Sequence, residues 1–264
     1  MRPDPIELVR LAERIAADTA QEAVRHRARG MGLVATKSSA TDMVTEVDRA
    51  AEALIVAALR AERPDDGIVG EEGADVTGTS GVRWLIDPID GTTNFLYGLP
   101  GWGVSIAAAD DEGPVAGAVA IPSLGELFSA ARGHGAHRDG EPLRCSDKAD
   151  LETALVGTGF SYQPGRRAEQ GMVLTALLPR VRDVRRFGSA AADLCFVAGA
   201  RLDVYYEAGL APWDLAAGEI IAREAGATVS DLEGGPVQAG SVLACSPALH
   251  EPFLDLLGAL GPPS

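Results

Sequence analysis

Residues 84–95, with the sequence WLIDPIDGTTNF, constrain this chain more than any other segment. The first residues predict a short buried strand that delivers Asp87, and Pro88 is expected to stop ladder pairing at its exit. Asp90 follows on a turn that ends in Gly91, so two carboxylates lie at the mouth of one strand. Burying two carboxylates is costly unless a cation neutralises them, and such oxygen ligands suit Mg2+.

The next residues predict a phosphate site beside these acids. Gly91, Thr92 and Thr93 supply a flexible residue and two hydroxyls at an expected helix start, where backbone N–H groups bind phosphate. Metal ligands next to a phosphate cradle indicate metal-assisted phosphoryl chemistry. The same D-P-I-D-G sequence also makes a good turn without any function, so the segment alone leaves both interpretations open.

The charge balance narrows the choice of partners. The 264-residue chain carries a net charge of −15. This field repels nucleic acid and anionic membranes, so neither is an expected partner. It would also repel a phosphorylated substrate unless bound cations reverse the sign locally. Solubility is the simpler interpretation of the acid excess.

Cysteine usage and hydropathy point to a cytoplasmic protein. Cys145, Cys195 and Cys245 are far apart and not spaced like a zinc site, which predicts reduced thiols. The N-terminal residues show no apolar signal region. No window approaches the roughly 18 uncharged apolar residues of a transmembrane helix.

The pattern of apolar residues predicts two halves of different class. A capped helix follows Asp4, a polar connector spans residues 30–41, a second helix begins near Thr45, and residues 73–82 form a loop. Strands follow between residues 104 and 131. Strands and helices then alternate from about residue 151. We expect an α+β half over residues 1–145 and an α/β half over residues 146–264.

Further acidic residues are candidates to join the two aspartates. Glu71 follows a predicted strand, Asp214 lies at a helix start, Asp48 lies on the second helix, and Glu207 ends a strand. Each has an ordinary explanation, such as a helix cap for Asp214 or a solvated helix position for Asp48. Their joint occurrence favours a site, because sites gather at the strand ends of α/β sheets.

Several blocks carry a family resemblance: DMVTEVD at 42–48 with GEE at 70–72, WLIDPIDGTTNF at 84–95, and WDLAAG at 213–218. The residues KSS at 37–39 and RFGSAA at 186–191 also fit. With these blocks in this order, the chain resembles the inositol monophosphatase family of Mg2+-dependent, lithium-sensitive phosphatases, and most of all its actinobacterial members. The resemblance runs from about residue 8 to residue 255. It implies a layered αβαβα sandwich, similar to that of fructose-1,6-bisphosphatases, and a homodimer.

The resemblance also implies roles for single residues. Two to three Mg2+ ions would bind, the first on Glu71, Asp87 and the carbonyl of Ile89. The second would bind Asp87, Asp90 and Asp214, and a third, weaker ion would lie near Glu71. Catalysis would involve Thr92 and Asp48, which orient and deprotonate the attacking water, together with Glu71. Backbone N–H groups of Gly91 and Thr92 would hold phosphate oxygens, and the substrate's hydroxyls would be contacted by Gly188, Ser189, Ala190 and Glu207.

The predicted function is a Mg2+-dependent phosphomonoesterase that acts on a small-molecule phosphate ester, myo-inositol 1-phosphate or a related polyol phosphate. Histidinol phosphatase, fructose-1,6-bisphosphatase and adenosine 3′,5′-bisphosphate phosphatase use the same metal core and remain alternatives. Glu207 favours a hydroxyl-rich substrate, but a carboxylate would also attract the amine of histidinol. An alternative of another class is a regulatory binding protein with vestigial phosphatase activity, because some bacterial relatives act on RNA-processing or transcription complexes.

Other conspicuous residues favour structural roles. Residues 133–135, with the sequence GHG, predict a turn rather than a phosphate loop. The arginines of residues 180–186 predict a solvated face or a dimer surface rather than a phosphate clamp. Asp193, on an apolar helix, predicts a buried structural acceptor.

Overall fold

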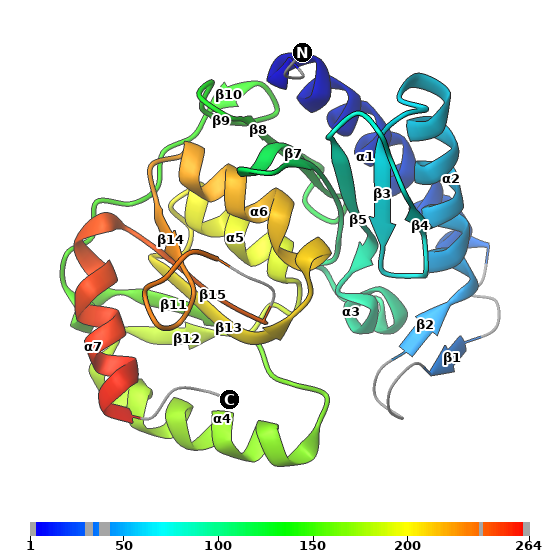
Figure 1. Ribbon diagram of the computed structural model, residues 1–264. Helices are drawn as coiled ribbons and strands as arrows, with labels where there is room; N and C mark the ends of the chain where they lie inside the picture. Colours follow the sequence, from blue (N-terminus) through cyan, green and yellow to red (C-terminus); the bar gives the residue numbers. More distant parts are fainter. Residues whose placement is uncertain (1–3, 30–33, 37–42, 238–239, 261–264) are drawn as a thin grey trace.

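The computed structural model describes residues 4–29, 34–36, 43–237 and 240–260, and the side chains of 34–36 and 43–45 are outside this description. Figure 1 shows five layers, in which two sheets alternate with three layers of helices. The first layer is α1 (Pro5–Ala28) with α2 (Glu46–Glu62), the central one is α5 (Ala190–Ala198) with α6 (Pro212–Glu224), and the last is α4 (Pro164–Leu177) with α7 (His250–Leu260). The predicted αβαβα sandwich is confirmed.

The larger sheet has eight strands in the order β10-β9-β8-β7-β6-β5-β3-β4. All neighbours in it are antiparallel except β3 and β5, which run parallel. Its strands are β3 (Gly67–Gly70), β4 (Asp75–Val76), β5 (Arg83–Asp90), β6 (Gly103–Asp110), β7 (Gly113–Ile121), β8 (Glu126–Ala131), β9 (Ala136–Arg138) and β10 (Glu141–Pro142).

The smaller sheet has five strands in the order β12-β11-β13-β15-β14. Its strand β11 (Leu155–Thr158) runs parallel to β12 (Asp183–Arg185) and to β13 (Val204–Leu210). The remaining pairs, with β14 (Thr228–Ser230) and β15 (Gly240–Cys245), are antiparallel. The other elements are α3 (Thr92–Tyr97), the strand pair β1 (Val34–Thr36) and β2 (Met43–Thr45), and the 3-10 turns η1 (Leu151–Thr153), η2 (Leu178–Arg180) and η3 (Pro247–Leu249).

Each interface between layers has its own apolar core. The helix α1 begins where the Asp4 carboxylate accepts from the Ile6 N–H. Its buried face packs on β7 and β6, while that of α2 packs on β5. Strand alternation sends Trp84 and Ile86 into this outer core and sends Leu85 into the core around α5 and α6. Asp87, two residues beyond Leu85, therefore faces the central helices.

The central helices pack closely against the larger sheet and against each other because small residues line the contacts. A Cβ at Gly117 of β7 would lie 2.8 Å from the Ala217 Cα, and one at Gly218 would lie 2.6 Å from the Leu194 side chain. Every residue of α5 is buried. The close packing fixes the N-terminal ends of α5 and α6 relative to β5.

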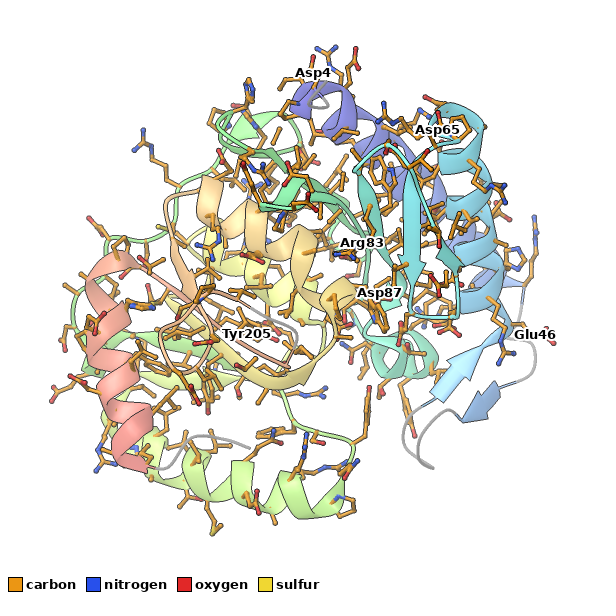
Figure 2. All side chains as sticks on the ribbon, in the orientation of Figure 1. Asp4, Glu46, Asp65, Arg83, Asp87 and Tyr205 are labelled. Atoms are coloured by element: carbon orange, nitrogen blue, oxygen red, sulfur yellow. The ribbon has the colours of Figure 1, made fainter. Side chains whose placement is uncertain are left out.

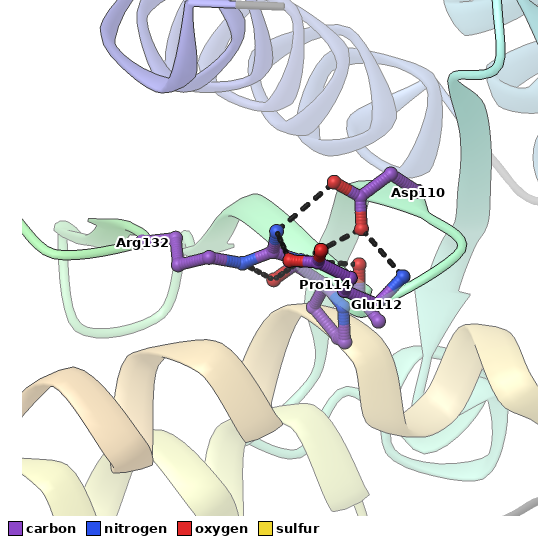
Figure 3. Close-up of polar contacts among 5 residues, drawn as sticks. Asp110, Glu112, Pro114 and Arg132 are labelled. Atoms are coloured by element: carbon purple, nitrogen blue, oxygen red, sulfur yellow. Dashed lines mark hydrogen bonds and ion pairs between the residues drawn. The ribbon is translucent and has the colours of Figure 1, made fainter. Parts of the chain in front are cut away.

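An arginine fastens the end of the large sheet that lies away from Asp87. Figure 3 shows Arg132, just after β8, reaching the β6–β7 hairpin. Its guanidinium donates to both carboxylate oxygens of Asp110 at 2.9 Å and to the carbonyls of Gly113 and Pro114 at 2.8 and 2.9 Å. These contacts satisfy the hairpin's carbonyl groups and hold three strands together.

Some expectations about single elements were wrong. β5 does not end before Pro88: its pairing with β6 is irregular after Asp87 and resumes at Asp90, so the proline occupies the irregularity. The expected loop at 73–82 contains the short strand β4, which pairs with β3. Glu207 lies inside β13 rather than at its end.

Strand β1 occupies part of the expected connector at 30–41. The rest of that connector, the KSS residues at 37–39 and Asp42 lie outside the described residues. In the described ranges, no helix is long and apolar enough to cross a membrane.

Candidate active site

A cavity of about 330 Å³ contains most of the predicted site residues. It opens where β5, α3 and the start of α6 meet β13 and the loop before α4, and Figure 2 shows Asp87 beside the central helices. The predicted residues that line it are Glu71, Asp87, Ile89, Asp90, Gly91, Thr92, Gly188, Ala190, Glu207 and Asp214. Asp48 and Ser189 lie behind this lining.

The two aspartates of the DPID turn are buried and individually oriented. Asp87 is 2% exposed, and its Oδ1 accepts from the Ile89 N–H at 3.0 Å. Asp90 is 9% exposed, and its Oδ2 accepts from the Ser189 hydroxyl at 2.6 Å and from the Ala191 N–H at 2.7 Å. The start of α5, distant in the sequence, thereby fixes the second carboxylate.

Glu71 and Asp214 reach the same cavity from other elements. The parallel pairing of β3 with β5 places Gly70 opposite Ile86, so Glu71 comes next to Asp87. Asp214 is in the first turn of α6, where its Oδ2 accepts from the Ala211 N–H at 2.7 Å. The capping interpretation of Asp214 and its place in the cavity are therefore compatible.

The three aspartates of the cavity have raised pKa values. The pKa of Asp87 lies well above its ordinary value because of burial first, and then because of the charges of Glu71, Asp90 and Asp214. Burial, followed by Asp90, also holds the pKa of Asp214 well above its usual range. The pKa of Asp90 is raised by burial, against the hydrogen bonds from Ser189 and Ala191. Bringing these acids together costs folding free energy.

The oxygen atoms that line the cavity are of the kind that a hard cation binds. Across the residues that the structure describes, no group of three or more acidic, histidine or cysteine side chains is already arranged to hold one metal ion. The cavity nevertheless gathers carboxylate oxygens and the Ile89 carbonyl, the ligands that Mg2+ and Ca2+ use, and the raised pKa values show a negative field that a cation would relieve. Closing the carboxylates around an ion therefore needs adjustment of their side chains.

The turn after Asp90 requires a glycine. Gly91 has φ of 89°, and a Cβ there would lie 2.9 Å from the Gly188 carbonyl oxygen. The helix that follows, α3, has only 6 residues. The Thr92 hydroxyl lies 3.3 Å from the Asp48 Oδ1 and 3.1 Å from the Ile89 carbonyl oxygen, so it joins a fully buried acid to the cavity wall.

Of the remaining predicted residues, some line the cavity and one supports a carboxylate from behind. Gly188, Ala190 and Glu207 line the cavity. Ser189 caps α5 by accepting from the Ala192 N–H and donates to Asp90, so its hydroxyl supports that carboxylate, and its predicted substrate contact stays a prediction. Burial raises the pKa of Glu207 to about 7, although the Tyr205 hydroxyl and the charge of Arg186 act to lower it.

Comparison with family models identifies the protein family to which this chain belongs. The inositol monophosphatase family model matches residues 4–259. The chain belongs to this family. Membership makes the protein an inositol phosphate phosphatase, and the layered fold and the acidic cavity agree with that class.

Individual relatives of the inositol monophosphatase family support the assignment over nearly the whole chain. An inositol-1-monophosphatase of Mycobacterium leprae is 47% identical over 274 residues, covering 96% of this chain and 94% of the relative. A Nus factor SuhB of Vibrio cholerae is 42% identical, covering 88% of this chain and 90% of that protein. The crystal structure of extragenic suppressor protein suhB from Bartonella henselae superposes with a TM-score of 0.89 at 35% identity, covering 94% of this chain and 97% of that one.

The phosphatase cavity also contains residues that the sequence analysis missed. Arg186 is exposed, as a solvated position predicts, but it also lines the cavity, and its place as the first residue of the RFGSAA block was the available signal. The loop before α4 had no recognisable motif. The further lining residues are Phe160, Ser161, Tyr162, Gln163, Arg166, Ala208, Gly209 and Leu210.

Glu52 is a missed supporting residue of the inositol monophosphatase site. This residue of α2 is 7% exposed, and its carboxylate accepts from the N–H groups of Glu72 and Ala74 at 2.8 and 2.9 Å. A Cβ at Gly70 would lie 2.2 Å from the same carboxylate. Glu52 thus holds the turn that carries Glu71.

Residues with predicted structural roles behave mostly as expected. The GHG segment forms a turn between β8 and β9 that is held by the Glu224 carboxylate, which accepts from the Gly133 and Gly135 N–H groups at 2.8 Å. Asp193 is buried at 1% exposure. Its Oδ1 has no hydrogen-bond partner among the described residues, so the structure does not support the acceptor role for that atom.

Proposed function

We propose that this phosphatase is a Mg2+-dependent phosphomonoesterase that hydrolyses myo-inositol 1-phosphate or a related polyol phosphate. The observation that carries the proposal is the convergence of four carboxylates, Glu71, Asp87, Asp90 and Asp214, on one cavity that Glu207 also lines. A negative field of this kind admits a phosphate ester only after cations bind. Members of the family are generally metal-dependent.

The proposed ligands follow from the lining. Glu71, Asp87 and the Ile89 carbonyl would hold one Mg2+, and Asp87, Asp90 and Asp214 a second, with a third weaker ion near Glu71. Bound Mg2+ would supply a water of lowered pKa and stabilise the charge that develops on the leaving alcohol. Glu52 and Ser189 would keep the ligands in place from behind.

The protein's own groups would orient the attacking water and the ester. The Thr92 hydroxyl has one proton to share between the Asp48 Oδ1 and the Ile89 carbonyl. When that proton lies toward Asp48, the Thr92 Oγ1 can accept a hydrogen bond from the attacking water, and Asp48 and Glu71 would share the task of deprotonation. Backbone N–H groups of Gly91 and Thr92 would hold phosphate oxygens, and Gly188, Ser189, Ala190 and Glu207 would contact the alcohol's hydroxyls.

The family resemblance extends the proposal to lithium inhibition, a homodimer and a cytoplasmic location. The same core also suits histidinol phosphate or fructose 1,6-bisphosphate, which are the competing substrates.

A second candidate is a regulatory binding role. A relative that is 42% identical bears the name Nus factor SuhB. We would test this role by pull-down with the Asp90→Asn variant: capture of transcription proteins equal to wild type would show binding that is independent of turnover, and no capture by either form would remove this candidate.

The decisive experiment for the enzyme is a phosphate-release panel. The substrates are inositol 1-phosphate, histidinol phosphate, fructose 1,6-bisphosphate and adenosine 3′,5′-bisphosphate, each with Mg2+, without it, and with added Li+. We expect inositol 1-phosphate with Mg2+ to be the best combination, Li+ to inhibit, and Asp90→Asn to lose nearly all turnover. Full activity without divalent metal, or a preference for another ester, would refute the corresponding part of the proposal.

A further inference from the structure

Two glycines, Gly157 on β11 and Gly159 one residue beyond the end of β11, face two functional side chains on β13. β11 runs parallel to β13, and Gly157 is directly opposite Tyr205 in the register. Gly159 follows two residues after Gly157, as Glu207 follows two residues after Tyr205. Residues two apart in an extended chain share a face, and the Cβ position of Gly159 falls on the Glu207 carboxylate, so both pairs lie on the same side of the sheet.

The glycines are needed for space. A Cβ at Gly159 would lie 1.9 to 2.1 Å from the carboxylate atoms of Glu207, which occupy that position. A Cβ at Gly157 would lie 2.6 Å from the Leu202 side chain and 3.2 Å from the Tyr205 ring. Neither glycine has a positive φ, so an alanine at either position would be opposed by the neighbouring side chains, which must move, and not by its own backbone.

Tyr205 fixes the carboxylate that fills this space. The tyrosine is fully buried, and its hydroxyl donates to the Oε2 of Glu207. Glu207 itself lines the cavity, together with Asp90 and Gly188. One oxygen of Glu207 is thus tied to the sheet while the side chain remains on the cavity wall.

We propose that Gly159 and Tyr205 are positioning residues for substrate recognition, which hold the Glu207 carboxylate where it accepts a hydrogen bond from a hydroxyl of the ester's alcohol. The inference rests on the proposed function for its substrate class. The two residues touch Glu207 and act through it. An ester without hydroxyls gains nothing from this arrangement.

The first test compares two substrates in the Gly159→Ala and Tyr205→Phe variants. For inositol 1-phosphate we expect KM to rise about tenfold with kcat nearly unchanged, because a contact made equally in ground and transition states affects KM. For phenyl phosphate, which has no hydroxyls, both constants should stay within about twofold. Equal losses on both substrates, or none on inositol 1-phosphate, would overturn the proposal.

A matched variant controls for the added methyl group. Gly171 of α4 has nothing within 4 Å of its Cβ position, so Gly171→Ala should leave both substrates unaffected. Gly159→Ala should fold, because the group in its way is the end of a flexible side chain, and a melting curve verifies this. If Gly159→Ala does not fold, Tyr205→Phe gives the same test without added volume.

A double-mutant cycle separates positioning from a general effect. In a Glu207→Ala background, Gly159→Ala and Tyr205→Phe should cause no further change in KM, because the group they position is gone. Additive effects in that background would overturn the proposal.

Failure of the proposed function is recognised separately. If wild type prefers phenyl phosphate to inositol 1-phosphate, the polyol assignment fails, and a crystal structure of Gly159→Ala then decides the positioning role. We expect the Glu207 carboxylate to have left the cavity wall in that structure. A carboxylate in its wild-type position would overturn the inference whatever the substrate.

Discussion

Two buried acids at opposite ends of the same strand pair behave in opposite ways. Asp66 precedes β3, near the end of the strands where Figure 2 labels Asp65, whereas Asp87 lies toward the other end of β5. Both are 2% exposed. Burial alone would raise the pKa of each, so the difference between them comes from their neighbours.

Asp66 is surrounded by donors and Asp87 by acids. Asp66 accepts two hydrogen bonds from Arg63, at 2.8 and 3.1 Å, one from the Ser80 hydroxyl at 2.6 Å and one from the Trp84 indole at 2.9 Å. These bonds outweigh burial and lower the pKa of Asp66. Glu71, Asp90 and Asp214 instead raise that of Asp87. The first acid stabilises the fold, while the second costs stability at the place where we propose that a cation binds.

The largest effect should come from Asp87→Asn. We expect turnover to fall at least about a hundredfold, since even residues that only support a metal ligand cost 10- to 100-fold. The metal-free protein should gain about 1 kcal/mol of unfolding free energy, because one repelling charge is removed. Phosphate release and denaturant titration with chelator measure the two effects, with the exposed Asp18→Asn as control. If the metal-free variant were less stable than metal-free wild type, the claim that Asp87 costs stability would be contradicted.

Asp66→Ala should show the reverse pattern. It leaves the Arg63 guanidinium and the Trp84 indole without their acceptor, so we expect a loss of about 3 kcal/mol in denaturant unfolding. Turnover per folded molecule should be unchanged because the site is at the other end of β5. The exposed neighbour Asp65→Ala should stay within about 0.5 kcal/mol of wild type. A large loss of turnover in folded Asp66→Ala would show that the two ends are coupled.

Added Mg2+ should distinguish the two ends directly. At a hundredfold excess over Kd, an ion that binds only the folded state adds about 2.7 kcal/mol, which corresponds to roughly 5–10 °C in Tm for a chain of this length. Asp66→Ala should retain this increment and Asp87→Asn should lose it. A Tm of wild type that does not respond to millimolar Mg2+ would contradict the metal-site proposal.

The smallest effect is in the pH dependence. The stabilisation by Asp66 is complete above its unfolded pKa of about 3.9 and is lost as pH falls through its lower folded pKa, so wild type should lose about 1 kcal/mol more than Asp66→Asn in the acid range. For Asp87 the sign is opposite. Its folded pKa is raised, so its penalty is relieved as pH falls, and the advantage of metal-free Asp87→Asn should shrink between pH 7 and 4. If the stability difference between wild type and variant changed with pH in the same way for Asp66→Asn and for Asp87→Asn, the environments assigned to the two acids would be refuted.

Local sequence signals predicted most elements and one part of the site. Helix periodicity and capping located α1 and α2, and the DPIDGTT segment identified the acids and the glycine turn. The two-residue strand β4 was too short to show a pattern, and Pro88 suggested a strand end because a proline normally interrupts pairing. The division of the chain into two halves at residue 145 stays a prediction. The two halves share one apolar core, which contains Leu85 of the first and Tyr205 of the second.

Motifs and periodicity alone predicted the family, the layered class of fold and the candidate acids, because these signals act over a few residues. Which acids meet depends on contacts between distant segments. Glu71 reaches Asp87 through parallel strand pairing, Ser189 orients Asp90 across 99 positions of sequence, and Gly159, just after β11, makes room for Glu207. These contacts between residues far apart in the sequence are set by packing between layers, which no local sequence pattern encodes.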